Sequence, residues 1–376
     1  MDKQSAINLI IETFEQSFDK EKYIEFIKNL FNKIEMETGP FYDGYSGQYI
    51  PDAFKQYINK YSRIGKFETE NKRIDVLIVY LNKDTSIERA RTMQRNFIAG
   101  YLTGKYGSDA VKDAAIVAFV SPDIEDWRFS LVKMEYKLTQ TKTGRPKGEE
   151  EFTPARRWSF LVGKNEKSYT AKSCFVPILE NDEKKPTLEN LEQAFNVEPV
   201  TEQFFKAYRY ALNETIIKLL KKYKDDTTKK HTFSQQLLSR ILFIYFFQKK
   251  GWLKWKNYEQ DKNYLKNLWL KYKSISKEKN TFYSKWLTSL FFGAFNKKSQ
   301  FINSDLTAEI RESFSLMPFL NGGLFTKNEL DELGFDLPDL VFEWLFEPDP
   351  NENDIRKGFL EIFNFTIDEA SPVDVE

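Results

Sequence analysis

The sequence predicts an α+β protein in which an N-terminal α/β domain precedes an all-helical domain. Two nearly continuous apolar stretches, 73–81 and 114–120, are rich in β-branched residues and predict buried strands. Between them lies a stretch with helical periodicity, and after about residue 200 most apolar residues recur at helical intervals. A strand, a helix and a strand followed by a long helical region is the pattern expected of this class.

The elements of the first domain follow in order. Apolar residues at helical spacing between Ile7 and Ile34 predict two helices that are broken near Asp19. The next predicted elements are the strand at 73–81, a helix at 86–102, the strand at 114–120, and further strands at 127–138 and 157–162. A polar, basic arm, 139–147, joins the last two strands, which therefore form a hairpin.

The charged segment 180–186 separates this domain from the helical part. We place the α/β domain at 1–180, a linker at 181–200 and the helical domain at 201–346. The stretch 234–250 is apolar nearly all round, which is typical of a helix at the centre of a bundle.

The composition excludes several classes of protein. A single cysteine, Cys174, and a single histidine, His231, exclude an intrachain disulfide framework and a zinc site of Cys and His ligands. No apolar stretch reaches the roughly 20 residues of a membrane span, and the residues after Met1 lack the layout of a signal peptide. We therefore expect a cytoplasmic protein without a membrane partner.

The neutral overall charge conceals two opposed segments. Residues 206–280 contain 19 Lys or Arg against 6 Asp or Glu, whereas 327–376 contain 3 basic against 15 acidic residues. Aromatic residues alternate with the lysines of the basic segment, a composition suited to binding nucleic-acid phosphates. The candidates for DNA contact here are Lys249, Lys250, Lys254 and Lys256. Two alternatives remain open, namely that the lysines form solvated helix faces or that the acidic end docks on them.

Two segments fit Pro-Asp followed by Glu-x-Lys, the pattern of a Mg²⁺-dependent nuclease. In such a site the carboxylates bind Mg²⁺, which neutralises the scissile phosphate, while the lysine positions the attacking water. The first match, Pro51-Asp52 with Glu70-Asn71-Lys72, lies in a polar stretch and is poorly placed. The second, Pro122-Asp123 with Glu135-Tyr136-Lys137, ends on an alternating strand that turns Glu135 and Lys137 to the same side.

The second match therefore supplies the candidate catalytic residues. Asp123 and Glu135 are predicted to bind Mg²⁺, Lys137 to act on the attacking water, and Asp75 to serve as a substitute carboxylate. The alternatives are a solvated hairpin face for Glu135 and Lys137 and a strand-edge partner for Asp75.

Arg91 and Arg95 lie one helical turn apart and are candidates for phosphate contact. Internal pairing with Glu88 is the alternative for this face. The glycine pair Gly322-Gly323 is followed by Leu and Phe, so we find neither a phosphate-binding P-loop nor a dinucleotide-binding motif.

Several segments, in the same order, resemble the region upstream of the methyltransferase domain in type IIG restriction–modification enzymes. They are 88–95, 126–132, 152–163, 234–253, 319–325 and 363–369. The more specific ones are Gln-Lys-Lys-Gly-Trp-Leu at 248–253 and Leu-Asn-Gly-Gly-Leu-Phe at 320–325. The resemblance extends over about 72–376, which is most of the chain.

The resemblance implies a phage-defence enzyme that joins a nuclease or nuclease-like domain, a helical connector and an adenine-N6 DNA methyltransferase. In such enzymes S-adenosylmethionine binds to the methyltransferase, whose glycine-rich loop and Asn-Pro-Pro-Tyr motif are absent from this sequence. Residues 347–376 would then lead into that domain. The implied partners are double-stranded DNA and a C-terminal or separate methyltransferase and target-recognition domain.

Three functions follow from these patterns. The first is a DNA-binding part of such an enzyme with a Mg²⁺-dependent endonuclease domain that is either active or degenerate. The second is a non-catalytic DNA-binding or protein-scaffolding module of a restriction complex. In the third, the helical half docks proteins without contacting DNA.

Overall fold

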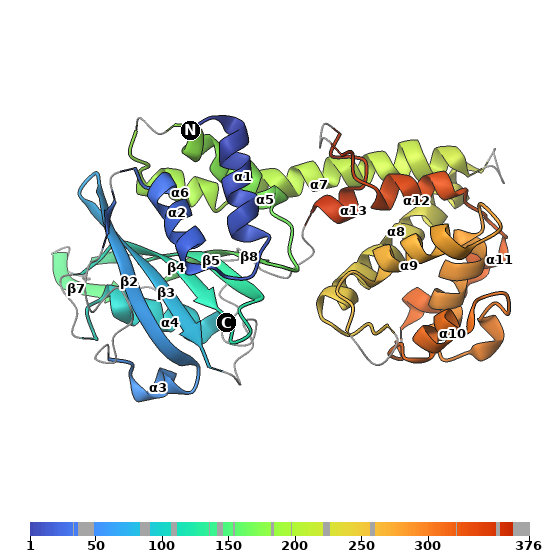
Figure 1. The fold of residues 1–376 in the computed structure, drawn as a ribbon, viewed down its shortest axis with the longest axis horizontal. Helices are drawn as coiled ribbons and strands as arrows, with labels where there is room; N and C mark the ends of the chain where they lie inside the picture. Colours follow the sequence, from blue (N-terminus) through green and yellow to red (C-terminus); the bar gives the residue numbers. More distant parts are fainter. Residues whose placement is uncertain are drawn as a thin grey trace. The chain divides into compact units, whose positions relative to one another are not determined.

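The computed structural model describes residues 1–32, 34–36, 49–82, 91–106, 111–134, 136–140, 146–152, 155–181, 184–196, 198–220, 226–255, 260–320, 322–350 and 354–363. These residues form two compact units, a sheet unit within Met1–Val200 and a helical unit within Thr201–Thr366 (Figure 1). The sheet unit combines strands and helices, whereas the described part of the helical unit has helices and no strand longer than a single bridge. The mixed α and β content agrees with the predicted α+β class.

The sheet unit is built on a six-stranded sheet with the strand order β1-β2-β3-β4-β5-β8. Strands β3 and β4 run parallel, and the other neighbouring pairs are antiparallel. The strands are β1 (Glu35–Met36), β2 (Ile58–Thr69), β3 (Lys72–Leu81), β4 (Ala114–Val120), β5 (Asp126–Lys133) and β8 (Arg156–Gly163). Strands β6 (Tyr136–Gln140) and β7 (Pro146–Phe152) pair separately. All four strands predicted in this domain are confirmed, although the stretch 127–138 divides between β5 and β6.

Strand β2 has no counterpart among the predicted elements. It pairs with β3 along most of its length, and the turn between them places Glu70 and Asn71 at φ values of 49° and 62°. Two successive residues with positive φ are typical of a tight hairpin turn, which usually contains glycine. The hairpin was missed because this turn lacks glycine and because β2 carries lysine and arginine among its apolar residues.

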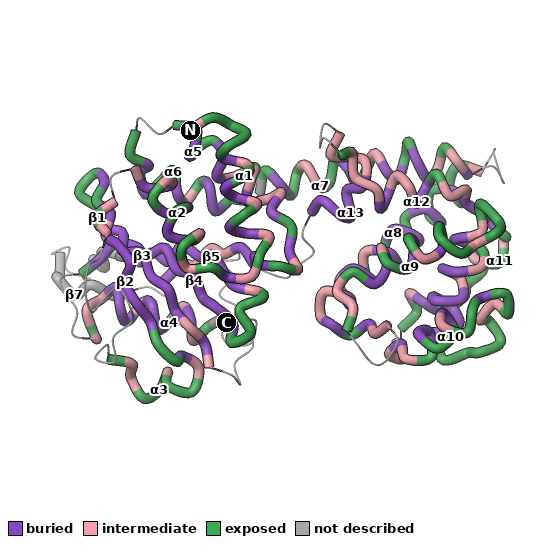
Figure 2. Tube along the Cα trace, viewed as in Figure 1, coloured by how far each residue is buried: buried purple, intermediate pink, exposed green. Residues whose placement is uncertain are grey.

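Helices cover both faces of the six-stranded sheet, whose strands are largely buried (Figure 2). One core layer lies between the sheet and helices α1 (Lys3–Phe14), α2 (Lys20–Leu30), α5 (Tyr169–Glu180) and α6 (Leu188–Ala194). Helix α4 (Arg91–Leu102) packs on the opposite face, where the short helix α3 (Asp52–Lys55) also lies close to β2. The break predicted near Asp19 is confirmed, since its carboxylate accepts hydrogen bonds from the first backbone amides of α2.

The stretch 188–195 belongs to the core of the sheet unit. Thr187 and Asn190 form a reciprocal capping box at the start of α6. Leu191 and Phe195 are almost fully buried against the other helices of this face. Residues 188–195 of the stretch predicted as a linker, 181–200, thus complete this core, although the charged segment before them has the composition of a linker.

The helical unit is organised around α8 (Thr227–Lys249), which is confirmed as the predicted central helix. Apolar side chains on several of its faces are buried, among them Leu237, Leu238, Ile241 and Ile244. The other described elements are α7 (Glu198–Tyr210), η1 (Ala211–Ile217), α9 (Tyr264–Ile275), η3 (Phe282–Leu287), η4 (Ser289–Ala294), η5 (Ser299–Phe301), α10 (Ala308–Ser315), η6 (Gly323–Phe325), α11 (Glu329–Glu332), α12 (Asp339–Phe346) and α13 (Phe359–Ile362). None of the helices described in either unit has the length and hydrophobicity needed to span a membrane.

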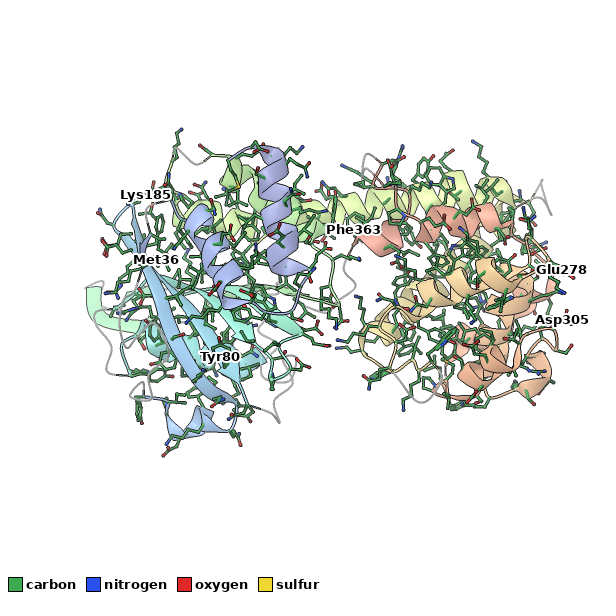
Figure 3. The ribbon with its side chains drawn as sticks, in the orientation of Figure 1. Met36, Tyr80, Lys185, Glu278, Asp305 and Phe363 are labelled. Carbon is green, nitrogen blue, oxygen red and sulfur yellow. The ribbon has the colours of Figure 1, made fainter. Side chains whose placement is uncertain are left out.

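Helix α13 completes the core of the helical unit. The Tyr245 hydroxyl donates a hydrogen bond of 2.5 Å to Glu361, which also forms a 3.2 Å ion pair with Lys266. The rings of Phe359 and Phe363 pack on Phe204, with Phe363 labelled in Figure 3. Residues 354–363, which follow the predicted boundary at residue 346, thus belong to the helical unit.

Candidate functional site

The candidate Asp75 lies at the end of the sheet where β3 begins. In register it is paired with Ala115 of β4, which is paired in turn with Val132 of β5. These three residues share the face that α4 covers, because directly paired residues point to the same side of a sheet. The Asp75 side chain is fully buried.

Three side chains engage the Asp75 carboxylate. Arg73 Nε lies 2.9 Å from Oδ1 and Arg73 Nη2 lies 3.4 Å from Oδ2, while Arg63 Nη1 lies 3.5 Å from Oδ2. The Tyr101 hydroxyl, from α4, donates a hydrogen bond of 2.6 Å to Oδ2. Arg73 reaches Asp75 because residues two apart on a strand point to the same face, and the β2–β3 hairpin brings in Arg63.

This environment keeps the Tyr101 hydroxyl protonated. Burial raises the pKa of Tyr101 well above its ordinary value, and the charge and hydrogen bonding of Asp75 raise it further against a smaller opposing effect of Arg63. The hydroxyl therefore remains a donor to Asp75. Among the described residues, Asp75 is the centre of a buried polar cluster, which we name the Asp75 cluster and define as Arg63, Arg73, Asp75 and Tyr101.

The Asp75 cluster does not fit a Mg²⁺ ion. Mg²⁺ requires near-octahedral oxygen ligands at close range and commonly keeps several waters. In this cluster two guanidinium groups and a hydroxyl occupy the carboxylate oxygens, and the carboxylate has no exposed surface. No group of three metal-binding side chains occurs in the part of the chain that the structure describes. These contacts agree with the strand-edge alternative for Asp75, and its role as a substitute catalytic carboxylate stays a prediction.

Asp123 and Met134 lie at opposite ends of β5. Asp123 precedes β5 and Met134 follows it, so the eight residues of the strand separate them by roughly 25 Å at about 3.3 Å per residue. Glu135 itself lies outside the described residues. The Mg²⁺ site of Asp123 and Glu135 stays a prediction. For Lys137 the structure gives only the backbone, which lies in β6 opposite Glu151.

Asp123 instead organises the turn between β4 and β5. Its carboxylate accepts a hydrogen bond from the Ser121 hydroxyl and another, at 3.3 Å, from the Glu125 amide. The next residue, Ile124, has a φ of 58°, which is unfavourable for a β-branched residue. The Ile124 carbonyl accepts a hydrogen bond of 2.7 Å from the Phe18 amide, a contact that fixes the turn against the start of α2.

Ile124→Gly is expected to raise the free energy of unfolding by about 0.5–1 kcal/mol, because glycine tolerates positive φ and the exposed side chain contributes little packing. The Phe18 contact involves only the Ile124 backbone and should persist. Urea unfolding of the full chain measures the change. Ile124→Val keeps the branched side chain and should leave the free energy of unfolding almost unchanged. If both variants changed it equally, the positive φ of Ile124 would not be a source of strain.

Of the two arginines predicted to bind phosphate, Arg95 is half-buried on α4 and donates a hydrogen bond of 3.4 Å to Asn96. Arg91 contributes its backbone to the start of α4, and its side chain lies outside the description. The phosphate contact of Arg91 and Arg95 stays a prediction.

Among the four predicted lysines, Lys249 and Lys250 close α8, and Lys254 follows in a bridge to Gln260. All three are half-buried, and the ammonium of Lys250 lies 5.8 Å from the centre of the Phe246 ring. Lys256 lies outside the described residues. Lys250 therefore lies beside an aromatic side chain, and the DNA contact of these lysines stays a prediction.

Elsewhere in the basic segment, acidic residues of the same chain neutralise lysines. On α9, Lys266 pairs with Glu361, Lys271 with Glu309, and Lys273 with Glu347, at 3.2, 2.9 and 2.6 Å. Lys285 pairs with Glu278 and Asp305 at 2.9 and 2.7 Å, and these hydrogen bonds raise its pKa to about 12 (both carboxylates are labelled in Figure 3). The alternative that the acidic end docks on the basic segment is thus confirmed for Lys266 and Lys273.

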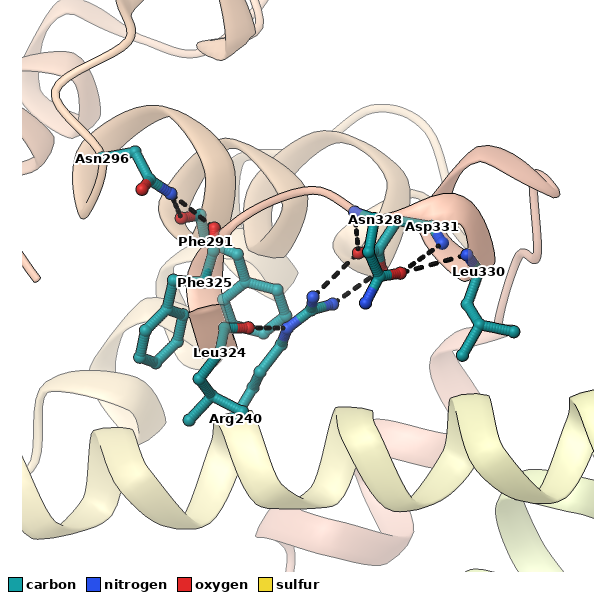
Figure 4. A network of polar contacts seen from close by, with 8 residues as sticks. All are labelled: Arg240, Phe291, Asn296, Leu324, Phe325, Asn328, Leu330 and Asp331. Carbon is teal, nitrogen blue, oxygen red and sulfur yellow. Dashed lines mark hydrogen bonds and ion pairs between the residues drawn. The ribbon is translucent and has the colours of Figure 1, made fainter. Parts of the chain in front are cut away.

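Residues 322–325 contact α8 through Arg240, which also forms a buried ion pair with Asp331 (Figure 4). Arg240 Nη1 and Nη2 donate to the two carboxylate oxygens of Asp331 at 2.7 and 2.8 Å, and both side chains are 1% exposed. Arg240 Nε donates a bond of 2.7 Å to the Leu324 carbonyl, and the Asn296 amide donates to the Phe325 carbonyl. The signal in the sequence was a lone arginine within an apolar helix, since charged residues are rarely buried unless paired.

No family model, curated protein or solved structure matches this chain.

Proposed function

We propose that this chain is a DNA-binding, non-catalytic part of a type IIG-like restriction–modification enzyme, with a nuclease-like sheet that lacks a working metal site. The proposal of a non-catalytic domain rests on the contacts of the Asp75 carboxylate, whose oxygens bind Arg63, Arg73 and Tyr101. The separation of Asp123 from the far end of β5 supports the same reading.

The DNA-binding reading rests on the lysines at the end of α8. Lys249 and Lys250 are neighbours at the end of α8, and Lys250 lies over the Phe246 ring, which in turn contacts the exposed ring of Trp252. On the basic helix α9, three lysines pair with carboxylates of the same chain, which reduces the net charge that this helix offers to phosphates. The resemblance agrees with this proposal, because segment 248–253 is one of its more specific parts. In this function the helical unit would brace an adenine methyltransferase, which alone would bind S-adenosylmethionine.

Binding of the full chain to a double-stranded oligonucleotide across a range of salt concentrations tests this function. We expect affinity to fall steeply with salt, because each phosphate contact releases a counterion. Lys249→Gln combined with Lys250→Gln should weaken binding and reduce the magnitude of the salt slope by up to about 2. Lys271→Gln combined with Lys273→Gln is the matched control and should change both quantities much less.

A plasmid-nicking assay with Mg²⁺ tests the absence of catalysis. We expect no nicking by the wild-type chain. Nicking that requires Mg²⁺ and disappears in Asp75→Asn, a variant first checked for folding, would establish the nuclease instead. Absence of any salt-dependent DNA binding would favour the scaffolding alternative.

A further inference from the structure

An aromatic surface lies at the end of α8 in the helical unit. The side chains of Phe243 and Trp252 are 44% and 52% exposed, and the Phe246 ring lies 6.2 Å from each of them. Phe247 lies beneath, 4.7 Å from Phe243 and 5.2 Å from Trp252. We name Phe243, Phe246 and Trp252 the aromatic platform.

The base of the platform is held firmly in place. The Phe325 ring lies 6.3 Å from Phe243, and the backbone on either side of this ring is fixed by Arg240 and Asn296. Gly323 lies two residues before Phe325, and no atom lies within 4 Å of the position that a Cβ atom would occupy on this glycine. A glycine with open space in front of it lets a ligand approach the backbone closely.

The cations beside the platform distinguish between classes of ligand. Lys250 lies over the Phe246 ring at 5.8 Å, and Lys249 precedes it at the end of α8. Lysine is depleted in the buried cores of protein–protein interfaces. Proteins that bind single-stranded nucleic acids, in contrast, combine exposed aromatic rings with cationic side chains along the backbone of the strand.

We propose that the aromatic platform binds unpaired nucleotides of a DNA strand, whose bases stack on Phe243 and Trp252 while Lys249 and Lys250 contact the phosphates. The length of the platform suits about two or three successive bases. Because stacking needs the flat face of a base, a fully paired duplex cannot use the platform. This inference rests on the proposed DNA binding and specifies the form of DNA that the helical unit prefers.

The test compares a single-stranded oligothymidylate of about 20 nucleotides with a duplex of the same length, at fixed salt and with the full chain. Trp252→Leu combined with Phe243→Leu keeps apolar side chains but removes two rings. We expect this variant to bind the single strand roughly tenfold or more weakly and the duplex nearly unchanged. Trp fluorescence of the wild-type chain should be quenched on binding the single strand, and the Trp252→Leu variant should lose most of this quenching.

The control variant is Phe205→Leu, which alters a ring that is 58% exposed on α7 and should leave both affinities unchanged. Circular dichroism confirms that each variant is folded. Equal binding of the single strand by the wild-type chain and the double variant would overturn the platform while leaving the proposed function intact. Failure of the wild-type chain to bind either form of DNA would overturn both proposals.

Discussion

Asp75→Asn is expected to lower the free energy of unfolding of the sheet unit by about 3–5 kcal/mol, because it removes one partner from a buried ion-pair cluster. Arg63 and Arg73 would keep their charges at the interface of β2, β3 and α4, where their side chains are 10% and 19% exposed. Tyr101 would also lose the carboxylate that accepts its hydrogen bond. Urea unfolding of the full chain, followed by circular dichroism, measures the loss.

Lys72→Met is the matched control for this variant. Lys72 forms a 2.9 Å ion pair with Asp113 at the same end of the sheet, but its side chain is 52% exposed. Solvent weakens such pairs, so we expect a loss below about 1 kcal/mol. If Asp75→Asn were as mild as Lys72→Met, the two guanidinium groups would not hold the carboxylate, and the metal-binding reading of Asp75 would regain support.

The sequence correctly predicted the strands and helices whose buried residues follow a simple apolar pattern. Strands β3 and β4 are continuous apolar runs, and α1 and α2 carry apolar residues at helical spacing. Strand β2 was missed because its polar residues include Arg63, whose partner Asp75 lies across the hairpin. When a polar residue is buried because a residue elsewhere in the chain pairs with it, the sequence around that polar residue does not show that it is buried.

The candidate Mg²⁺ site was chosen from the spacing of residues along the chain. Spacing between Pro-Asp and Glu-x-Lys measures separation along the chain, whereas Mg²⁺ binding depends on separation in space. Strand β5 lies between Asp123 and Met134, so residues close in the sequence are placed at opposite ends of the sheet. The ion pair between Arg240 and Asp331 shows the converse, since 91 positions along the chain separate two residues in direct contact.

Arg240→Met is expected to lower the free energy of unfolding of the helical unit by about 3–5 kcal/mol, because Asp331 would remain charged in a site that is 1% exposed. The loss also removes the donor to the Leu324 carbonyl and the contact of the guanidinium with Phe292, whose ring centre lies 5.0 Å away. Arg240→Lys should recover little of this stability, because an ammonium cannot bind both carboxylate oxygens and the carbonyl in the same geometry. Thermal unfolding of the full chain followed by near-ultraviolet circular dichroism measures both variants.

The double variant Arg240→Met with Asp331→Leu separates the unpaired charge from the other contributions. Removal of both charges should reduce the loss to about 1–2 kcal/mol, which is the expected cost of a Leu324 carbonyl without its donor. Lys218→Met, which breaks an exposed pair with Glu214 in the same unit, should change stability by less than about 1 kcal/mol. A double variant as unstable as the sum of Arg240→Met and Asp331→Leu would show that the two side chains contribute independently. Arg240 would then support residues 322–325 through packing and its hydrogen bond to the Leu324 carbonyl, without a contribution from Asp331. In that case Phe325 should still support Phe243 of the aromatic platform when Asp331 is replaced.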